Sequence, residues 1–86
     1  MQKVKILNSL GLHARPSAQF VQIASKFKSD VYLSKNNREV NGKSIMGVMM
    51  LAAEMGTELT IMVDGGDQDR AMEALVELVN NKFHEE

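Results

Sequence analysis

Cysteine and tryptophan are absent from this chain of 86 residues, and proline occurs once. Without cysteine the chain can form no disulfide, no thiolate nucleophile and no zinc–cysteine site. Small secreted domains often depend on disulfides, so we expect a reducing compartment, the cytoplasm. No apolar run approaches the roughly 18 residues of a membrane span, and residues 1–8 lack the apolar core of a signal peptide. We therefore expect no membrane insertion.

The chain is also short, with a mass of 9.6 kDa and a hydrophobic fraction of 44%. That size predicts a single domain over residues 1–86 with one small core. A deep enclosed pocket for a large substrate is not expected. Any chemistry should take place at the surface or together with a partner.

Charge is distributed unevenly along the chain. Residues 1–43 hold eight Lys or Arg and two Asp or Glu, whereas residues 44–86 hold two Lys or Arg and nine Asp or Glu. The asymmetry either marks an interaction face or disappears when the two halves interleave in space. A basic half could bind nucleic acid, but only Tyr32, Phe20 and Phe27 could stack on bases, and the periodicity places the phenylalanines in the core. We therefore do not expect a nucleic-acid partner.

Hydrophobic periodicity predicts four strands and three helices. The strands are expected at 3–6, 31–33, 39–41 and 59–63, and the helices at 16–27, from 45 to near Gly56, and from about 68 to 83. Asn36 and Asn37 suit a tight turn because asparagine tolerates positive φ. Short, hairpin-linked strands in the order β-α-β-β-α-β-α favour an α+β fold. We expect a four-stranded antiparallel sheet with three helices packed on one face.

The two histidines differ in their surroundings. His84 lies in a polar segment, and we expect it to be solvated. His13 lies in a glycine-marked turn that runs directly into the first helix. A helix start offers free backbone N–H groups and a partial positive charge to an anion, and Arg15 adds donors shaped for phosphate oxygens. A neutral imidazole there could accept a phosphoryl group covalently.

The alternative is that His13 is an ordinary turn residue. No carboxylate neighbours it in the sequence, so an arrangement of the Ser-His-Asp type has no local support. Two histidines and no cysteine also argue against a metal site.

Ser44 stands immediately before the second helix, where serine commonly caps the N-terminus. The alternative role is regulatory phosphorylation, which would add about −1.5 to −2 charges to the surrounding surface. In the helix itself, the apolar residues surround the axis instead of forming one stripe, so a small domain cannot bury them all. We expect Ile45, Met46 and Met49 to form an exposed apolar patch suited to partners, the alternative being that methionine fills the core.

Two motifs resemble those of a known family. Residues 11–16, Gly-Leu-His-Ala-Arg-Pro, are similar to the active-site signature of HPr, the histidine-containing phosphocarrier of the bacterial phosphoenolpyruvate-dependent phosphotransferase system. Residues 43–49, Lys-Ser-Ile-Met-Gly-Val-Met, resemble the second signature of this family, around its regulatory serine. The resemblance covers essentially the whole chain, and it leaves open whether the pathway is sugar transport or a nitrogen-related branch.

The resemblance implies an open-faced β-sandwich. We expect a carrier, not a free-standing enzyme, that needs no cofactor, and nothing in the sequence demands more than a monomer. His13 would accept a phosphoryl group on Nδ1 from Enzyme I and pass it to an Enzyme II A component, with Arg15 contacting the phosphate. Ser44 would be the target of an HPr kinase/phosphorylase where the host has one. The implied partner-docking residues are Leu12, Ala18, Gln19, Ile45, Met46 and Met49. The alternative is a regulatory module that acts mainly through phosphorylated Ser44 and binds transcription regulators.

Overall fold

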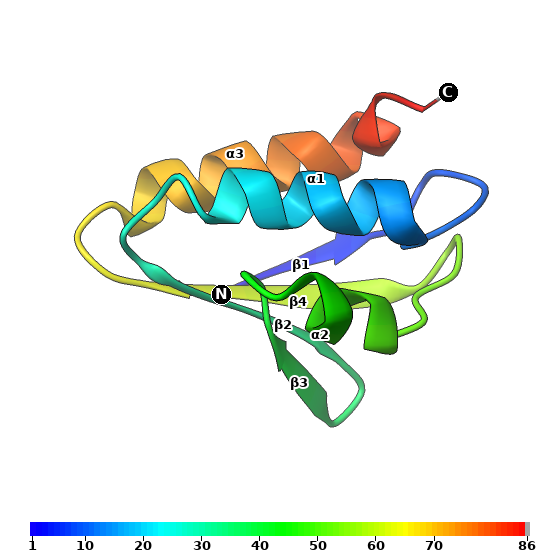
Figure 1. Ribbon diagram of the computed structural model, residues 1–86, viewed down its shortest axis with the longest axis horizontal. Coiled ribbons are helices and arrows are strands. Elements are labelled where there is room, and N and C mark those ends of the chain that lie inside the picture. The colour runs from blue at the N-terminus through cyan, green and yellow to red at the C-terminus, as the bar shows by residue number, and fades with distance from the viewer. Residues whose placement is uncertain (86) are drawn as a thin grey trace.

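Four antiparallel strands form one sheet in the computed structural model, which describes residues 1–85 (Figure 1). The strands are β1 (Gln2–Lys5), β2 (Asp30–Lys35), β3 (Arg38–Asn41) and β4 (Glu58–Asp64). Their order in the sheet is β1-β4-β2-β3. Strand β4, in which apolar and polar residues alternate, therefore lies between β1 and β2. The turn between β2 and β3 contains Asn36 at a φ of 57°, as the asparagine pair predicted.

Three helices accompany the sheet, which confirms the predicted α+β fold. Helices α1 (Ala14–Ala24) and α3 (Gln68–Asn80) lie side by side over one face of the sheet (Figure 1). The short α2 (Ile45–Met50) packs against α1 and against β3. A single 3₁₀ turn, η1 (Lys82–His84), follows α3. None of the helices in residues 1–85 is long and apolar enough to cross a membrane.

The core lies between the sheet and the helices. Its side chains come from every layer, because each strand and helix presents one apolar side to the interior. The fully buried apolar side chains include Ile6, Phe20, Leu33, Val48, Ile61, Leu75 and Phe83.

All three helices end earlier than the periodicity predicted. The first was expected over residues 16–27, and α1 ends at Ala24. We expected the second helix to continue to near Gly56, but α2 ends at Met50, and Ala52 adopts a left-handed φ of 50°. The Lys35 ammonium donates hydrogen bonds to the carbonyls of Leu51 (3.1 Å) and Ala52 (3.3 Å), at the place where the last carbonyls of a helix need partners. The third helix was expected to run to residue 83, and it ends at Asn80.

Asp67 joins the start of α3 to a distant loop. Although it occupies the N-cap position, its side chain does not cap the helix. Its carboxylate accepts hydrogen bonds from the Ser29 hydroxyl, from the Lys28 amide (2.9 Å) and from the Ser29 amide (3.0 Å). These hydrogen bonds lower the pKa of Asp67 from 3.8 to about 2, and the bond from the Ser29 hydroxyl has the largest effect. Desolvation of the carboxylate opposes them with a smaller effect. Asp67 thereby ties the loop before β2 to α3.

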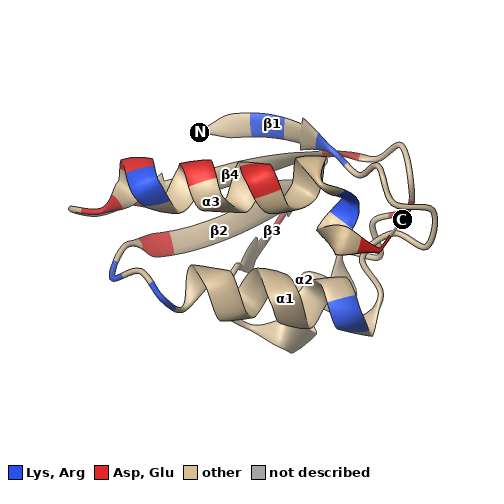
Figure 2. Cartoon of the chain, turned by 90° about the horizontal axis from the view of Figure 1, so that it is seen from above, with Lys and Arg blue, Asp and Glu red and all other residues tan. Residues whose placement is uncertain are grey.

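The charge asymmetry of the sequence persists in the fold. Acidic residues line α3, whereas α1 carries none, and basic residues lie in β1, at the start of α1 and in the loop after it (Figure 2). The two helices that cover the sheet therefore differ in electrostatic character.

Candidate functional site

His13 occupies the N-cap position of α1, in an extended conformation (φ −78°, ψ −169°). Its backbone carbonyl accepts the first helical hydrogen bond, from the Ser17 amide (3.1 Å), but its side chain does not cap the helix. The imidazole is about one-third exposed. His13 therefore presents a reachable ring at the positive end of an 11-residue helix.

The loop before His13 is held from two sides. Gly11 has a φ of 68°, and a Cβ atom at this position would lie 2.4 Å from the carbonyl oxygen of Ala53. The next amide, that of Leu12, donates a 2.8 Å hydrogen bond to the same oxygen. The buried Asn8 side chain donates from Nδ2 to the Gly11 carbonyl (2.8 Å). Only a glycine fits this close backbone contact, which fixes the path of the chain into α1.

A carboxylate that the sequence did not indicate lies against the ring. Oε2 of Glu85 is 2.8 Å from Nε2 of His13, and Oε1 of Glu85 accepts a 2.8 Å hydrogen bond from Nδ2 of Asn8. The Glu85 side chain is only 14% exposed. We expected no local carboxylate partner for His13, and the partner instead comes from 72 positions further along the chain. The segment after α3 reaches the end of the molecule where α1 begins (Figures 1 and 2).

The first turn of α1 provides groups for an anion beside the ring. Ala14 and Arg15 are the first two helical residues, and amides at these positions have no partner within a helix. Pro16 follows, has no N–H to contribute and is tolerated in a first turn. The Arg15 side chain is exposed. His13 and Arg15 thus both lie at the start of α1, as the sequence predicted.

Ser44 is the N-cap residue of α2, as predicted. Its hydroxyl accepts a 3.1 Å hydrogen bond from the Gly47 amide, and the side chain is half-buried. The other histidine, His84, is exposed, also as predicted.

The predicted apolar patch is present on α2. Ile45, Met46 and Met49 are 44%, 69% and 37% exposed. Further apolar side chains that the sequence did not indicate are exposed at Leu10, Met50 and Met55.

The remaining implied docking residues differ in their access to a partner. Ala18 and Gln19, on α1, are half-buried. The expectation that Leu12 docks partners needs correction, because Leu12 is only 5% exposed and belongs to the core. Leu12 therefore offers almost no surface to a partner.

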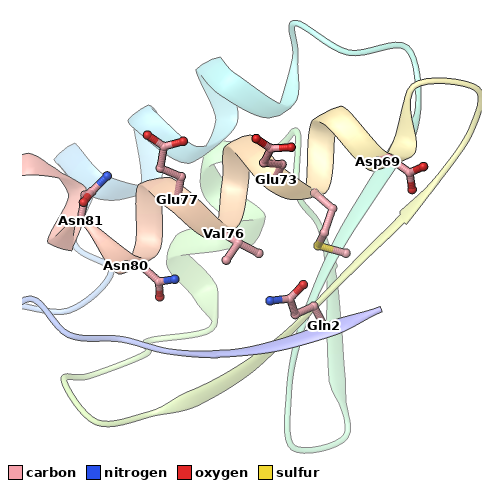
Figure 3. A pocket seen from close by; sticks show the side chains of 8 residues that line it. Gln2, Asp69, Glu73, Val76, Glu77, Asn80 and Asn81 are labelled. Carbon is pink, nitrogen blue, oxygen red and sulfur yellow. The ribbon is translucent and has the colours of Figure 1, made fainter.

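A groove lies elsewhere, between α3 and β1 (Figure 3). Val76 and Asn80 of α3 point toward β1, and Gln2 of β1 points back, while the carboxylates of Glu73 and Glu77 point away from that strand. Because no acid–base pair converges in this groove, it offers no reactive arrangement. His13, in contrast, lies at the surface, where we expected any chemistry of so small a chain to take place.

The chain is similar to known proteins in both sequence and structure. The model of the PTS HPr component phosphorylation site family matches residues 1–81. The phosphocarrier protein HPr of Neisseria meningitidis serogroup A is 55% identical over 84 residues, which cover 98% of this chain and 94% of the relative. The crystal structure of HPr-C-His from Thermoanaerobacter tengcongensis has a TM-score of 0.93 at 48% identity and covers 100% of this chain and 99% of its own.

A second branch of relatives is also similar. The crystal structure of Crh, described as the Bacillus subtilis catabolite repression containing protein and as a domain-swapped dimer, has a TM-score of 0.79 at 48% identity, covering 95% of this chain and 94% of its own. Sequence, fold and the full-length matches agree: the chain belongs to the HPr family of the phosphotransferase system.

Proposed function

We propose that the chain is a phosphocarrier. Nδ1 of His13 accepts a phosphoryl group from phosphorylated Enzyme I and delivers it to an Enzyme II A component of a sugar or nitrogen-related pathway. The observation that carries this proposal is the histidine at the N-cap of α1. Its side chain does not cap the helix, and the imidazole is about one-third exposed to solvent. The chain acts as a covalent intermediate between two enzymes and is regenerated in each cycle.

The transfer balances without a further reactant. The lone pair of Nδ1 attacks phosphorus, the nitrogen–phosphorus bond of the donor breaks, and the donor nitrogen keeps the electron pair of that bond. The proton on Nε2 stays on the His13 ring. The phosphoryl oxygens are then next to the start of α1, where the amides of Ala14 and Arg15 and the Arg15 guanidinium can donate to them.

The test is phosphorylation by Enzyme I and phosphoenolpyruvate, followed by intact mass. We expect one acid-labile phosphoryl group on the wild type and none on His13→Ala. His84→Ala is the matched control, because it removes the exposed histidine and should be modified like the wild type. An unmodified wild type with a competent Enzyme I, or a modified His13→Ala protein, would overturn the proposal.

The docking surface is proposed to be the exposed patch Ile45, Met46 and Met49 on α2, with Ala18 and Gln19 on the adjacent α1. Exposed apolar side chains that are grouped on one element are typical of a partner surface. Met46→Ala should raise the KM of Enzyme I for the carrier. Met55→Ala removes an equally long side chain that is 59% exposed outside α2, and it should leave the KM unchanged. Equal effects of the two substitutions would contradict this assignment.

Regulation at Ser44 is a second proposed role. Ser44 directly precedes Ile45 and Met46, so a phosphate there would place about −1.5 to −2 charges beside the apolar patch. Ser44→Asp should slow phosphoryl transfer while the protein stays folded, and Ser44→Ala should not slow it. Normal transfer by the Asp variant would count against the switch.

The alternative function is that of a regulatory module that binds transcription regulators through phosphorylated Ser44. It is favoured by the similarity to Crh, whose description names catabolite repression. His13 argues against this as the only role, because a module of that kind needs no phosphoryl acceptor at the start of α1. Regulator binding that depends on Ser44 phosphorylation, in a protein that Enzyme I cannot modify, would support the alternative.

A further inference from the structure

We infer that Glu85 is a positioning residue for His13, held in place by Asn8. This inference rests on the proposed phosphocarrier function and adds the group that orients the ring and balances its charge. The carboxylate joins His13 to Asn8 in the loop that precedes it. Oε2 lies 2.8 Å from Nε2 of His13, and Oε1 accepts a hydrogen bond from Nδ2 of Asn8 at 2.8 Å.

The contact assigns the two nitrogens of the ring. An ionised carboxylate can only accept hydrogen bonds, so Nε2 must carry the proton and donate it to Glu85. In a neutral imidazole the other nitrogen then has a free lone pair. Glu85 thereby holds His13 in the tautomer in which Nδ1 is the nucleophile, and it limits rotation of the ring.

The same contact stabilises the positive charge that the reaction creates on the His13 ring. When Nδ1 bonds to phosphorus and Nε2 keeps its proton, the ring becomes positively charged. A carboxylate already bonded to Nε2–H stabilises that charge without moving, as the aspartate of a Ser-His-Asp triad stabilises its imidazolium. The phosphorus would bond to Nδ1, the ring nitrogen that Glu85 does not contact, so the imidazole would separate the negative charge of Glu85 from that of the phosphoryl group.

Asn8 restrains Glu85. Its side chain is 0% exposed and bridges two groups, since Nδ2 donates to the Gly11 carbonyl as well as to Glu85. Oδ1 of Asn8 has no partner among the described residues, which is unfavourable for a buried amide oxygen. The Nδ2 group of Asn8 donates to Gly11 and to Glu85, and these two hydrogen bonds position the site. This role explains why the buried amide oxygen is left without a partner among the described residues.

The backbone before Glu85 is consistent with the same role. Lys82, Phe83 and His84 all have left-handed φ angles, of 56°, 55° and 59°, which are unfavourable for residues with a Cβ atom. Such conformations persist where the surrounding structure imposes them, often at functional sites. Here Phe83 is fully buried and anchors the turn, and the turn directs Glu85 toward His13.

The experiment compares Glu85→Gln, Glu85→Ala and Glu85→Asp. Glu73→Gln is the matched control, because it removes the same charge from an exposed position on α3. The first readout is nuclear magnetic resonance of the ¹⁵N-labelled imidazoles without any partner protein. We expect a slowly exchanging Nε2–H proton for His13 in the wild type and in Glu73→Gln, and its loss in Glu85→Ala. The exposed His84 should show no such proton and provides the internal reference.

The second readout is the rate of phosphoryl transfer from Enzyme I. By analogy with residues that orient a histidine in metal sites, Glu85→Gln and Glu85→Ala should lower kcat about 10- to 100-fold, with little change in KM. Glu85→Asp, which keeps the charge, should recover part of the rate. Thermal unfolding should stay within a few degrees of the wild type, which separates positioning from a merely structural role.

The outcomes separate the two proposals. If His13→Ala is still phosphorylated, the phosphocarrier assignment falls, while the Nε2–H signal can still be present. If Enzyme I modifies His13 but the Nε2–H proton is absent from the wild type, or the Glu85 variants transfer at the wild-type kcat, the role of Glu85 is refuted and the phosphocarrier function stands.

Discussion

Replacing Gly11 by alanine tests how the loop before His13 is held. A residue with a Cβ atom at a φ of 68° costs about 1–2 kcal/mol. The new Cβ would lie 2.4 Å from the Ala53 carbonyl oxygen, so the two segments must separate. Loss of the adjoining Leu12–Ala53 hydrogen bond costs about 0.5–1.5 kcal/mol, and the remaining overpacking about 1–3 kcal/mol. Gly11→Ala should therefore lower the free energy of unfolding by about 2.5–6.5 kcal/mol.

Gly56→Ala provides the matched control. Gly56 also has a left-handed φ, of 90°, but a Cβ atom there meets nothing within 4 Å. Only the conformational cost of about 1–2 kcal/mol should be lost. Urea denaturation followed by circular dichroism should separate the two variants by at least ~1.5 kcal/mol, and thermal midpoints by roughly 6 °C or more.

Equal destabilisation of the two variants would refute the close contact at Gly11. The contact also has a functional consequence, because Gly11 and Asn8 set the position of His13. Under conditions in which Gly11→Ala remains folded, phosphoryl transfer should be slower than in Gly56→Ala. Transfer at the same rate in both folded variants would show that this loop does not position the histidine.

Three further predictions concern single interactions. Asp67 has a folded-state pKa of about 2, below its usual value of 3.8, so its stabilisation is complete above about pH 4 and is lost as the pH falls through 2; in Asp67→Asn, urea midpoints should lose this part of their pH dependence. Ser44→Ala removes the N-cap acceptor of α2 and should cost about 1 kcal/mol in urea denaturation, whereas Ser44→Asp should retain most of the cap. Lys35→Met keeps the apolar stem but removes the donor to the carbonyls of Leu51 and Ala52; amide exchange in α2 should become faster, and an unchanged rate would exclude this cap.

Local patterns in the sequence determined most of the fold. Strand alternation, helical spacing and the asparagine turn are short-range signals, because they follow from backbone geometry within a few residues. The sequence therefore predicted the four strands, the three helices and the capping role of Ser44, all of which the structure has. It also predicted the placement of His13 at the start of α1. The family resemblance added the expected chemistry.

Other features depend on contacts between segments that are distant in the chain. The periodicity of α2 continues beyond Met50, but Lys35 of a neighbouring strand binds the carbonyls where the helix ends. Leu12 lies beside the histidine in the motif, yet the contact with the segment at Ala53 turns it into the core. Asp67 was suited to the start of α3, and it binds the loop at Ser29 instead.

The pairing of His13 with Glu85 has the same cause. A carboxylate within a polar segment has no periodicity or cap signal that assigns it to a histidine 72 positions earlier. Burial of Phe83 against the core brings the segment back over the start of α1, and only then does the carboxylate meet the ring. The sequence alone determined the position of the histidine in the fold, through local helix geometry. The tertiary structure decided which of its nitrogens is bonded, because that depends on where the end of α3 directs the chain.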